Sequence, residues 1–292
     1  MRIHSGYVAL AFSLSLPLAA CGTGGGPAAG AAGAKSPGME QSPTPAAAPA
    51  PESAEDFLAL AEKAMAGEAA WTFAVKGREG LTLQGQKSDA TYRATVHRGM
   101  APEALHSQGV STSSKGVRTS EEIYVVDGTA YLKKGDAPWK DAPASDPGMR
   151  NKVEDPVAAI EEFLAYAQTA TGQDDVTLTE ADGTVELRVG SDKQKLGAVR
   201  DQAWVKKAVR EFDPTADQLR AAGVPVNNDQ LTLSGLTEVL VLDATSYHVK
   251  SHRFEFGFLV PHGGQNIAFE QDVRQENRGT YDGQIELPAD LR

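Results

Sequence analysis

The sequence predicts an α+β fold, in which helices cover one face of a single large antiparallel sheet. Most of the chain after residue 70 alternates apolar and polar residues with a period of two, which is typical of strands. Few stretches have helical spacing, and they fall between long runs of consecutive strands. Asp127-Gly128 and Asp182-Gly183 are dipeptides that tight hairpin turns prefer, so the strands beside them should pair antiparallel.

The amino-terminal residues have the features of an exported protein. A weakly basic start and a short apolar run from Tyr7 to Leu18 are typical of a secretory signal over residues 1–20, and the run is shorter than the roughly 20 residues that span a bilayer. The sequence from Leu18 to Cys21, followed by Gly22, resembles a bacterial lipobox. Cys21 is the only cysteine, so we expect it to carry an acyl anchor. The alternative is an ordinary cleavage site with an incidental cysteine.

Residues 21–52 are expected to be a disordered tether, since Gly, Ala, Pro and Ser dominate them and offer almost no core. The folded domain should therefore span residues 53–292. The full chain carries a formal net charge of −11, and loss of residues 1–20 removes only Arg2, which gives −12. This charge argues against binding nucleic acid or anionic lipid headgroups through bulk charge. Attachment to the extracytoplasmic face of the cell membrane should depend on the acylated Cys21, because stable anchoring needs about two chains.

The first half of the domain should begin with a helix and continue as strands. Ser53 and Asp56 form a loose capping-box pattern, and the helix should close at Gly67. Residues 104–120 are polar and predict either exposed strands or a mobile loop. Breaks at Gly77, Gly80 and Gly85 should separate the first strands. The strands expected here span residues 71–75, 81–83, 92–96, 122–126 and 129–133.

The second half should hold two helical regions and the remaining strands. Asp155-Pro156 predicts the start of a helix over 157–168. Residues 193–222 have an apolar stripe with helical spacing, and Asp213-Pro214 predicts the start of a separate short piece within them. The strands expected here span residues 175–180, 184–189, 236–242, 247–260, 265–275 and 281–287.

This layout resembles a known family. It has a lipobox, a tether and an amphipathic first helix. Its characteristic segments are Trp71–Val75, the hairpin Tyr124–Leu132 followed by Trp139, the strand Glu238–Ala244 with Tyr247–Val249, and a closing Tyr281–Pro288. Together they resemble the actinobacterial LppX/LprG-type lipoprotein family, of the LolA-like class, over about residues 53–292. The resemblance implies a half-open β-barrel closed by helices around an apolar cavity for lipid or lipidated cargo. Residues 104–120 and 193–222 depart from the family pattern, so the resemblance does not define the shape of the cavity mouth.

The sequence carries no catalytic signature, so we expect no enzyme, cofactor or metal site. It has no G-x-S-x-G motif, and the glycine-rich run 22–26 lies in the tether without a following Lys-Ser/Thr. His248 and His252 would lie about 13 Å apart on one strand, too far to share a metal. A site with His262 is the alternative, but solvent-facing histidines are the expectation. Acidic pairs such as Glu161-Glu162 should likewise be solvated.

Apolar positions on the strands are the candidate binding residues. Phe254, Phe256 and Phe258 alternate, so their rings should share one face of one strand. They form either core beneath the helices or the wall of a cavity for acyl chains. The same alternatives apply to the other candidates, which are Trp71, Phe73, Val75, Tyr92, Ile123 and Val125.

Two classes of function fit these observations. The first is a membrane-anchored lipoprotein that binds or transfers a lipid or another hydrophobic ligand. The second is an envelope sensor or interaction lipoprotein, similar to LolA-like regulators, that binds a membrane-protein partner and performs no chemistry. The same apolar residues serve both classes, so the sequence leaves the choice open.

Overall fold

The computed structural model describes residues 50–150, 155–169 and 176–291. The predicted signal, Cys21 and nearly all of the predicted tether lie outside the described residues. The segment Pro49–Arg292 forms one compact unit. Its first helix begins directly after Ser53, as the sequence predicts.

Within the described residues, twelve strands form one antiparallel sheet. The strands from the first half of the chain are β1 (Ala70–Leu83), β2 (Gln86–Met100), β3 (Glu103–Thr112), β4 (Arg118–Val126), β5 (Thr129–Lys134) and β6 (Lys140–Pro143). Those from the second half are β7 (Thr177–Ala181), β8 (Thr184–Ser191), β9 (Gln194–Lys195), β10 (Thr232–Asp243), β11 (Val249–His262) and β12 (Gln265–Thr280).

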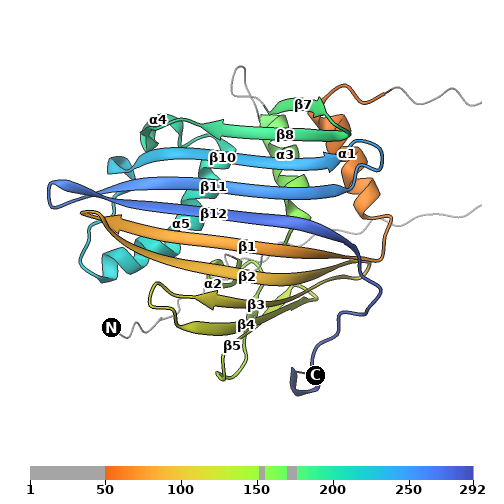
Figure 1. Ribbon diagram of the computed structural model, residues 1–292, viewed down its shortest axis with the longest axis horizontal. Coiled ribbons are helices and arrows are strands. Elements are labelled where there is room, and N and C mark those ends of the chain that lie inside the picture. Colours follow the sequence, from red (N-terminus) through yellow and green to blue (C-terminus); the bar gives the residue numbers. More distant parts are fainter. Residues whose placement is uncertain (1–49, 151–154, 170–175, 292) are drawn as a thin grey trace, which may run out of the picture. The chain divides into compact units, whose positions relative to one another are not determined.

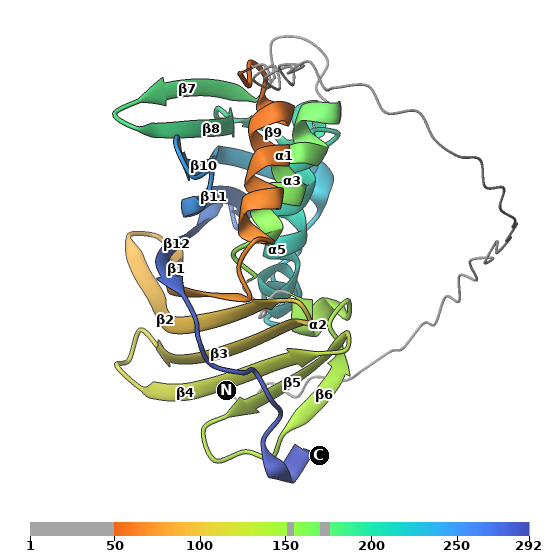
Figure 2. The same cartoon turned by 90° about the vertical axis from the view of Figure 1, so that its right-hand side faces the viewer.

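The strands lie side by side in the order β6-β5-β4-β3-β2-β1-β12-β11-β10-β8-β7, and the short β9 pairs with β10. The first and last strands, β1 and β12, therefore meet in the middle of the sheet (Figure 1). The sheet is open, because its edge strands β6 and β7 do not pair with each other. It curves toward the helices at its β6 end (Figure 2). The predicted α+β class, a large curved antiparallel sheet covered by helices, is confirmed.

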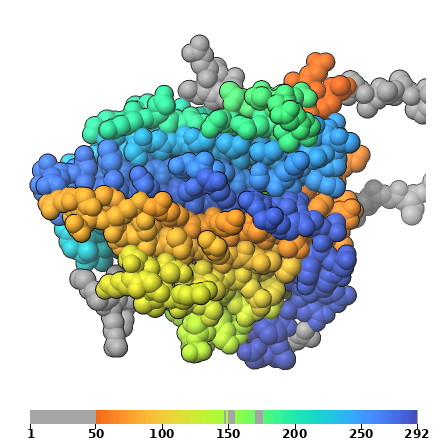
Figure 3. Space-filling view, viewed as in Figure 1, coloured from red at the N-terminus to blue at the C-terminus, as the bar shows by residue number. Residues whose placement is uncertain are grey.

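Helices cover one face of this sheet. They are α1 (Ala54–Met65), α2 (Pro147–Arg150), α3 (Ala158–Thr169), α4 (Leu196–Val199) and α5 (Ala203–Ala221), with 3-10 turns η1 (Asn228–Gln230) and η2 (Ala289–Leu291). We call the face under α1, α3 and α5 the inner face and the opposite one the outer face (Figure 2). Viewed from the outer face, the strands lie in front of the helices (Figures 1 and 3).

Helix α1 begins where its capping residues predict. The Ser53 hydroxyl accepts from the backbone N–H of Asp56, and the Asp56 carboxylate accepts from the backbone N–H of Ser53. Its buried residues are Phe57, Leu58, Ala61 and Met65. The indole N–H of Trp71 donates to the Met65 carbonyl at 2.9 Å, which joins the end of the helix to β1.

Two of the three predicted glycine breaks are wrong. Gly77 and Gly80 lie inside β1, which pairs without interruption with β2 and is also paired there with β12. A strand that is paired on both sides tolerates the small loss of stability that an interior glycine causes. Gly85 is a true turn residue, since it and Gln84 have positive φ angles of 77° and 52°.

The polar stretch 104–120 forms strands, which settles one of the alternatives left open by the sequence. It supplies β3 and the start of β4, which pair along their length. The predicted hairpin between β4 and β5 is confirmed, with Asp127 and Gly128 at φ 51° and 74° as a type I′ turn requires.

Helix α5 runs through Pro214 instead of restarting there, so the predicted second piece is wrong. Proline removes one helical hydrogen bond. The buried side chains of Phe212, Thr215 and Ala216 hold the helix against the sheet on both sides of this residue. Tertiary packing thus outweighs the local signal for a break.

The predicted closing strand over residues 281–287 is also wrong, because this segment contains no strand. The ring of Tyr281 instead stacks on His97 of β2, with centroids 3.9 Å apart. Further along, the indole N–H of Trp139 donates to the Asp290 carboxylate at 3.1 Å. The Tyr281 backbone N–H also donates to the Ala70 carbonyl at 2.9 Å. The carboxyl-terminal segment is therefore held by side-chain contacts and this backbone bond, and not by a strand ladder.

Candidate functional site

The structure places most of the predicted binding residues in one large hydrophobic core. Six are almost fully buried there, at 4% exposure or less: Trp71, Phe73, Val75, Phe254, Phe256 and Phe258. Tyr92 and Val125 are half-buried and pack against this core. Ile123 belongs to a second, smaller cluster. Cys21 lies outside the described residues.

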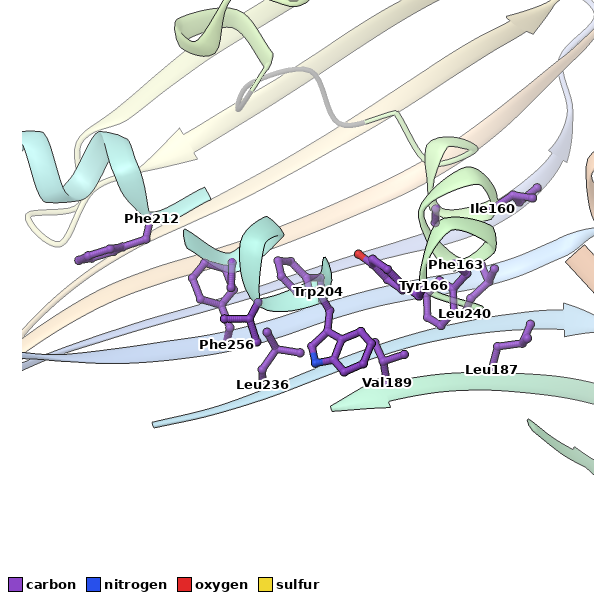
Figure 4. Packing of buried hydrophobic residues seen from close by; sticks show 14 of the residues in the cluster. Ile160, Phe163, Tyr166, Leu187, Val189, Trp204, Phe212, Leu236, Leu240 and Phe256 are labelled. Carbon is purple, nitrogen blue, oxygen red and sulfur yellow. The ribbon is translucent and has the colours of Figure 1, made fainter. Parts of the chain in front are cut away.

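The predicted aromatic stripe of β11 lies on the inner face as one set. The Phe256 ring centroid is 5.0 Å from that of Phe254 and 5.7 Å from that of Phe258. Phe212 of α5 approaches Phe258 and Phe269 at 5.0 and 4.9 Å, so the helix packs directly on these rings. Figure 4 shows Phe256 and Phe212 among the packed side chains of this core. The stripe serves as core in the structure described here.

The apolar inner face is divided in two. The large core covers β8, β10, β11, β12, β1 and the adjoining parts of β2 and β3. The small cluster holds Ile123, Ala130 and Leu132 of β4 and β5, with Met149 of α2. Val125 is half-buried and packs against both clusters. The two clusters therefore meet near β3 and β4 without merging.

Short side chains of β3 lie where the clusters meet. Ser107, Gly109 and Ser111 alternate with outward-facing residues, so they point to the inner face. Tyr92 of β2 reaches across them, and its hydroxyl lies 3.3 Å from that of Ser107. We call Tyr92, Ser107, Gly109, Ser111 and Val125 the junction.

The Tyr92 ring rests directly over Gly109. A Cβ atom added at Gly109 would lie 2.7 Å from atoms of this ring, closer than packed atoms allow. A side chain at residue 109 would thus displace the tyrosine, because the two positions share the same space. The junction combines a half-buried aromatic ring with a strand that has almost no side-chain bulk of its own.

A buried polar cluster lies deeper, beneath α3 and α5. It consists of Glu162, Tyr166, Lys207, Glu238, His252 and Gln275. Glu238 of β10 is fully buried, and its carboxylate receives hydrogen bonds from Lys207 at 2.7 Å and from the Tyr166 hydroxyl at 3.0 Å. The His252 Nε2 atom lies 2.8 Å from the same carboxylate, and its Nδ1 atom lies 3.1 Å from the Gln275 side-chain oxygen. Lys207 also pairs with Glu162.

The charges in this cluster compensate one another. Burial alone would raise the pKa of Glu238, but the charge of Lys207 and hydrogen bonds from His252 and Lys207 lower it to about 2. Burial would lower the pKa of Lys207, and the negative charges of Glu238 and Glu162 reverse this and raise it. Burial, followed by the charge of Glu238, raises the pKa of Tyr166. Glu238 and Lys207 are therefore both ionised, and Tyr166 is a neutral donor.

Two sequence expectations fail here. His252 is buried instead of solvent-facing, and Glu162 is an ion-pair partner instead of a solvated surface group. One signal was available: Glu238 occupies an inward position between Leu236 and Leu240, where alternation calls for an apolar residue. Its partners come from other strands and helices, so the sequence alone did not identify them.

The polar cluster is a clamp by its geometry. It joins α3 and α5 to three neighbouring strands, β10, β11 and β12, through residues that are buried or nearly so. Separating the partners of a buried ion pair is strongly unfavourable, because it leaves an uncompensated charge in the interior. Both helices are consequently fixed over this half of the inner face.

The histidines predicted to share one strand do not converge. His248 precedes β11, and its ring lies against Trp71 with centroids 4.7 Å apart. His262 lies at the opposite end of β11. Among the described residues, no three His, Cys, Asp or Glu side chains come together as metal ligands. In the same part of the chain, no helix is long and apolar enough to cross a membrane.

Comparison with known proteins gives only distant likenesses. No family model and no curated protein matches the chain. Among solved structures, a DUF1329 family protein from Desulfovibrio piger is similar at 8% identity and a TM-score of 0.30, over 80% of this chain and 95% of that one. A β-barrel-like protein of the domain of unknown function DUF1849 from Brucella abortus is similar at 8% identity and a TM-score of 0.22, over 74% of this chain and 99% of that one. TM-scores of this size carry no inference about what the chain binds.

Proposed function

We propose that the chain is a membrane-anchored envelope protein whose folded unit holds a lipid or another hydrophobic molecule at the junction. The anchor in this proposal is an acylated Cys21 at the extracytoplasmic face of the membrane, and no chemical reaction is involved. The observation that supports it best is the division of the inner apolar face into two clusters that do not merge.

The junction suits an apolar tail better than the aromatic stripe does. The clamp fixes α3 and α5 over β10–β12, and the phenylalanine rings there are packed against α5. At the junction, Tyr92 and Val125 remain half-buried, and β3 offers only short side chains. Each square ångström of apolar surface that a ligand covers there contributes about 25 cal/mol. A tail bound at the junction would join the two clusters into one apolar layer.

Introducing bulk at the junction should compete with the ligand. In Val125→Trp the larger ring should occupy the ligand's place, lower the amount of lipid that co-purifies with residues 50–292, and leave the unfolding midpoint nearly unchanged. Phe256→Trp is the matched control, because overfilling packed core costs about 1–3 kcal/mol. We expect this control to be destabilised and still to carry lipid. Lipid is measured by mass spectrometry of organic extracts, and stability by urea unfolding.

A wild-type unit that carries no lipid after expression in bacteria would contradict the proposal. So would a Val125→Trp variant that retains the full wild-type amount of lipid. Either result would favour the other class of function, an envelope protein that binds a membrane-protein partner.

A further inference from the structure

The outer face carries a basic hollow that the proposed function does not use. Its volume is about 740 Å³, and it lies over β1, β2, β3 and the start of β4. Three cationic side chains line it: Lys76, Arg93 and Arg118. Its other lining residues with polar side chains are Thr91, Thr95, Gln108 and Thr112. No carboxylate is among the residues that line it.

Two of the cations of the hollow are direct neighbours on the outer face, and the third lies two strands away on the same face. Lys76 of β1 is directly opposite Arg93 of β2, so their Cβ atoms are about 5 Å apart. Arg118 of β4 pairs in register with Thr112, which pairs with Thr91, two residues from Arg93. Like charges directly opposite each other in a sheet are destabilising. The chain places such a pair in a hollow although its net charge is −11.

Three neighbouring cations of the outer face, on β1, β11 and β12, have carboxylate partners. Arg78 pairs with Asp89 at 2.7 Å, and Arg253 pairs with Asp272 at 2.9 Å. Arg274, which is opposite Lys76 on its other side, lies 3.5 Å from the same Asp272. Within the described residues, no ion pair or side-chain hydrogen bond joins Lys76, Arg93 or Arg118 to another group.

We propose that this hollow binds a phosphate-class anion, held by Lys76, Arg93 and Arg118 with hydroxyl donors from the threonines. A guanidinium group matches phosphate oxygens with two parallel hydrogen bonds, and an ammonium group adds a point charge. A concave site also concentrates the field of its charges. Because no carboxylate lines the hollow, the bound anion supplies the negative charge that reduces the repulsion between Lys76 and Arg93. The hollow shares only Gly109 with the junction, and its cationic side chains lie on the opposite face of the sheet. The proposal therefore does not depend on lipid binding at the junction.

The ligand phosphate has two sources, a soluble phosphate compound or a lipid headgroup. Two probes distinguish them: inorganic pyrophosphate, and a phosphatidic acid incorporated into micelles of the neutral detergent that holds the full chain. Each is titrated calorimetrically into the full chain in a neutral detergent. Binding of pyrophosphate indicates a soluble ligand, and binding of the lipid alone indicates a headgroup. In both cases affinity should fall with added salt, because exposed charges are screened.

The test variant is Lys76→Gln/Arg93→Gln, and the matched control is Lys63→Gln/Lys206→Gln. The control removes the same charge from two exposed lysines on α1 and α5. We expect about tenfold or greater loss of affinity in the test variant, and less than about twofold in the control. The bound probe should raise the melting midpoint of wild type and control but not of the test variant. Failure of both probes to bind wild type, or equal binding by test variant and wild type, would overturn the proposal.

Discussion

Replacing Lys207 by methionine is expected to lower the free energy of unfolding by about 3–5 kcal/mol, because it leaves a buried charge without its partner. Lys207 is 8% exposed and bonds both Glu162 and the fully buried Glu238. The Tyr166 hydroxyl that remains donates a neutral hydrogen bond and supplies no positive charge. Urea unfolding at pH 7 measures the loss.

A second substitution separates the charge effect from lost packing. In Lys207→Met/Glu238→Gln the unpaired carboxylate is gone, so much of the stability should return. Lys207 also lies over the Phe254 ring at 4.5 Å, and a methionine there retains apolar contact. If the free energy of unfolding of Lys207→Met is within about 1 kcal/mol of the wild-type value, the polar cluster does not hold the helices on the sheet as described above.

The pH dependence of the two proteins should have opposite signs. In the wild type, the pKa of Glu238 is lowered from 4.5 to about 2. Its contribution to stability is therefore present above pH 4.5 and is lost as the pH falls toward 2. Removal of Lys207 removes the largest influence that lowers the pKa of Glu238, so we expect burial to raise this pKa above its unfolded value and protonation to favour the folded state. The destabilisation of Lys207→Met should shrink on acidification from pH 7 to pH 5.

The second large effect is expected at Cys21. In Cys21→Ala the only thiol is gone, so palmitate labelling should disappear and the protein should leave the detergent phase in Triton X-114 partition. A diacylated cysteine supplies the two chains that stable anchoring requires. Thr23→Ala is the control, because it changes a residue of the predicted tether beside the predicted lipobox and keeps the thiol. Unchanged palmitate labelling of Cys21→Ala would contradict the predicted anchor.

Local signals predicted the local structure well. The Ser53 and Asp56 pattern marked the start of α1, and Asp127-Gly128 marked the turn between β4 and β5. Each feature depends on residues a few positions apart, which the sequence displays directly. The breaks predicted at Gly77 and Pro214 are wrong because non-local contacts outweigh the local preference. Strands pair with β1 on both sides of it, and buried side chains hold α5 before and after Pro214.

The candidate sites were less accessible from the sequence, because they depend on register. Alternation placed Phe254, Phe256 and Phe258 on one face, but it did not distinguish packed core from a cavity wall, since both use the same residues. Tyr92 covers Gly109 because β2 and β3 pair as they do. Lys76 meets Arg93 for the same reason, across a different pair of strands. These contacts become visible only once the strand order and the register are known.

The most direct test of lipid binding at the junction is photo-crosslinking with a palmitic acid analogue that carries a diazirine near its terminal methyl group. The analogue is irradiated in a mixture with a protein of residues 50–292, and digestion followed by mass spectrometry locates the modified peptides. Excess palmitate serves as the competitor. The proposal predicts competed adducts in β2, β3 and β4, within residues 86–126, and none in β11, Val249–His262. Competed adducts concentrated in β11, or the absence of competed adducts, would contradict it.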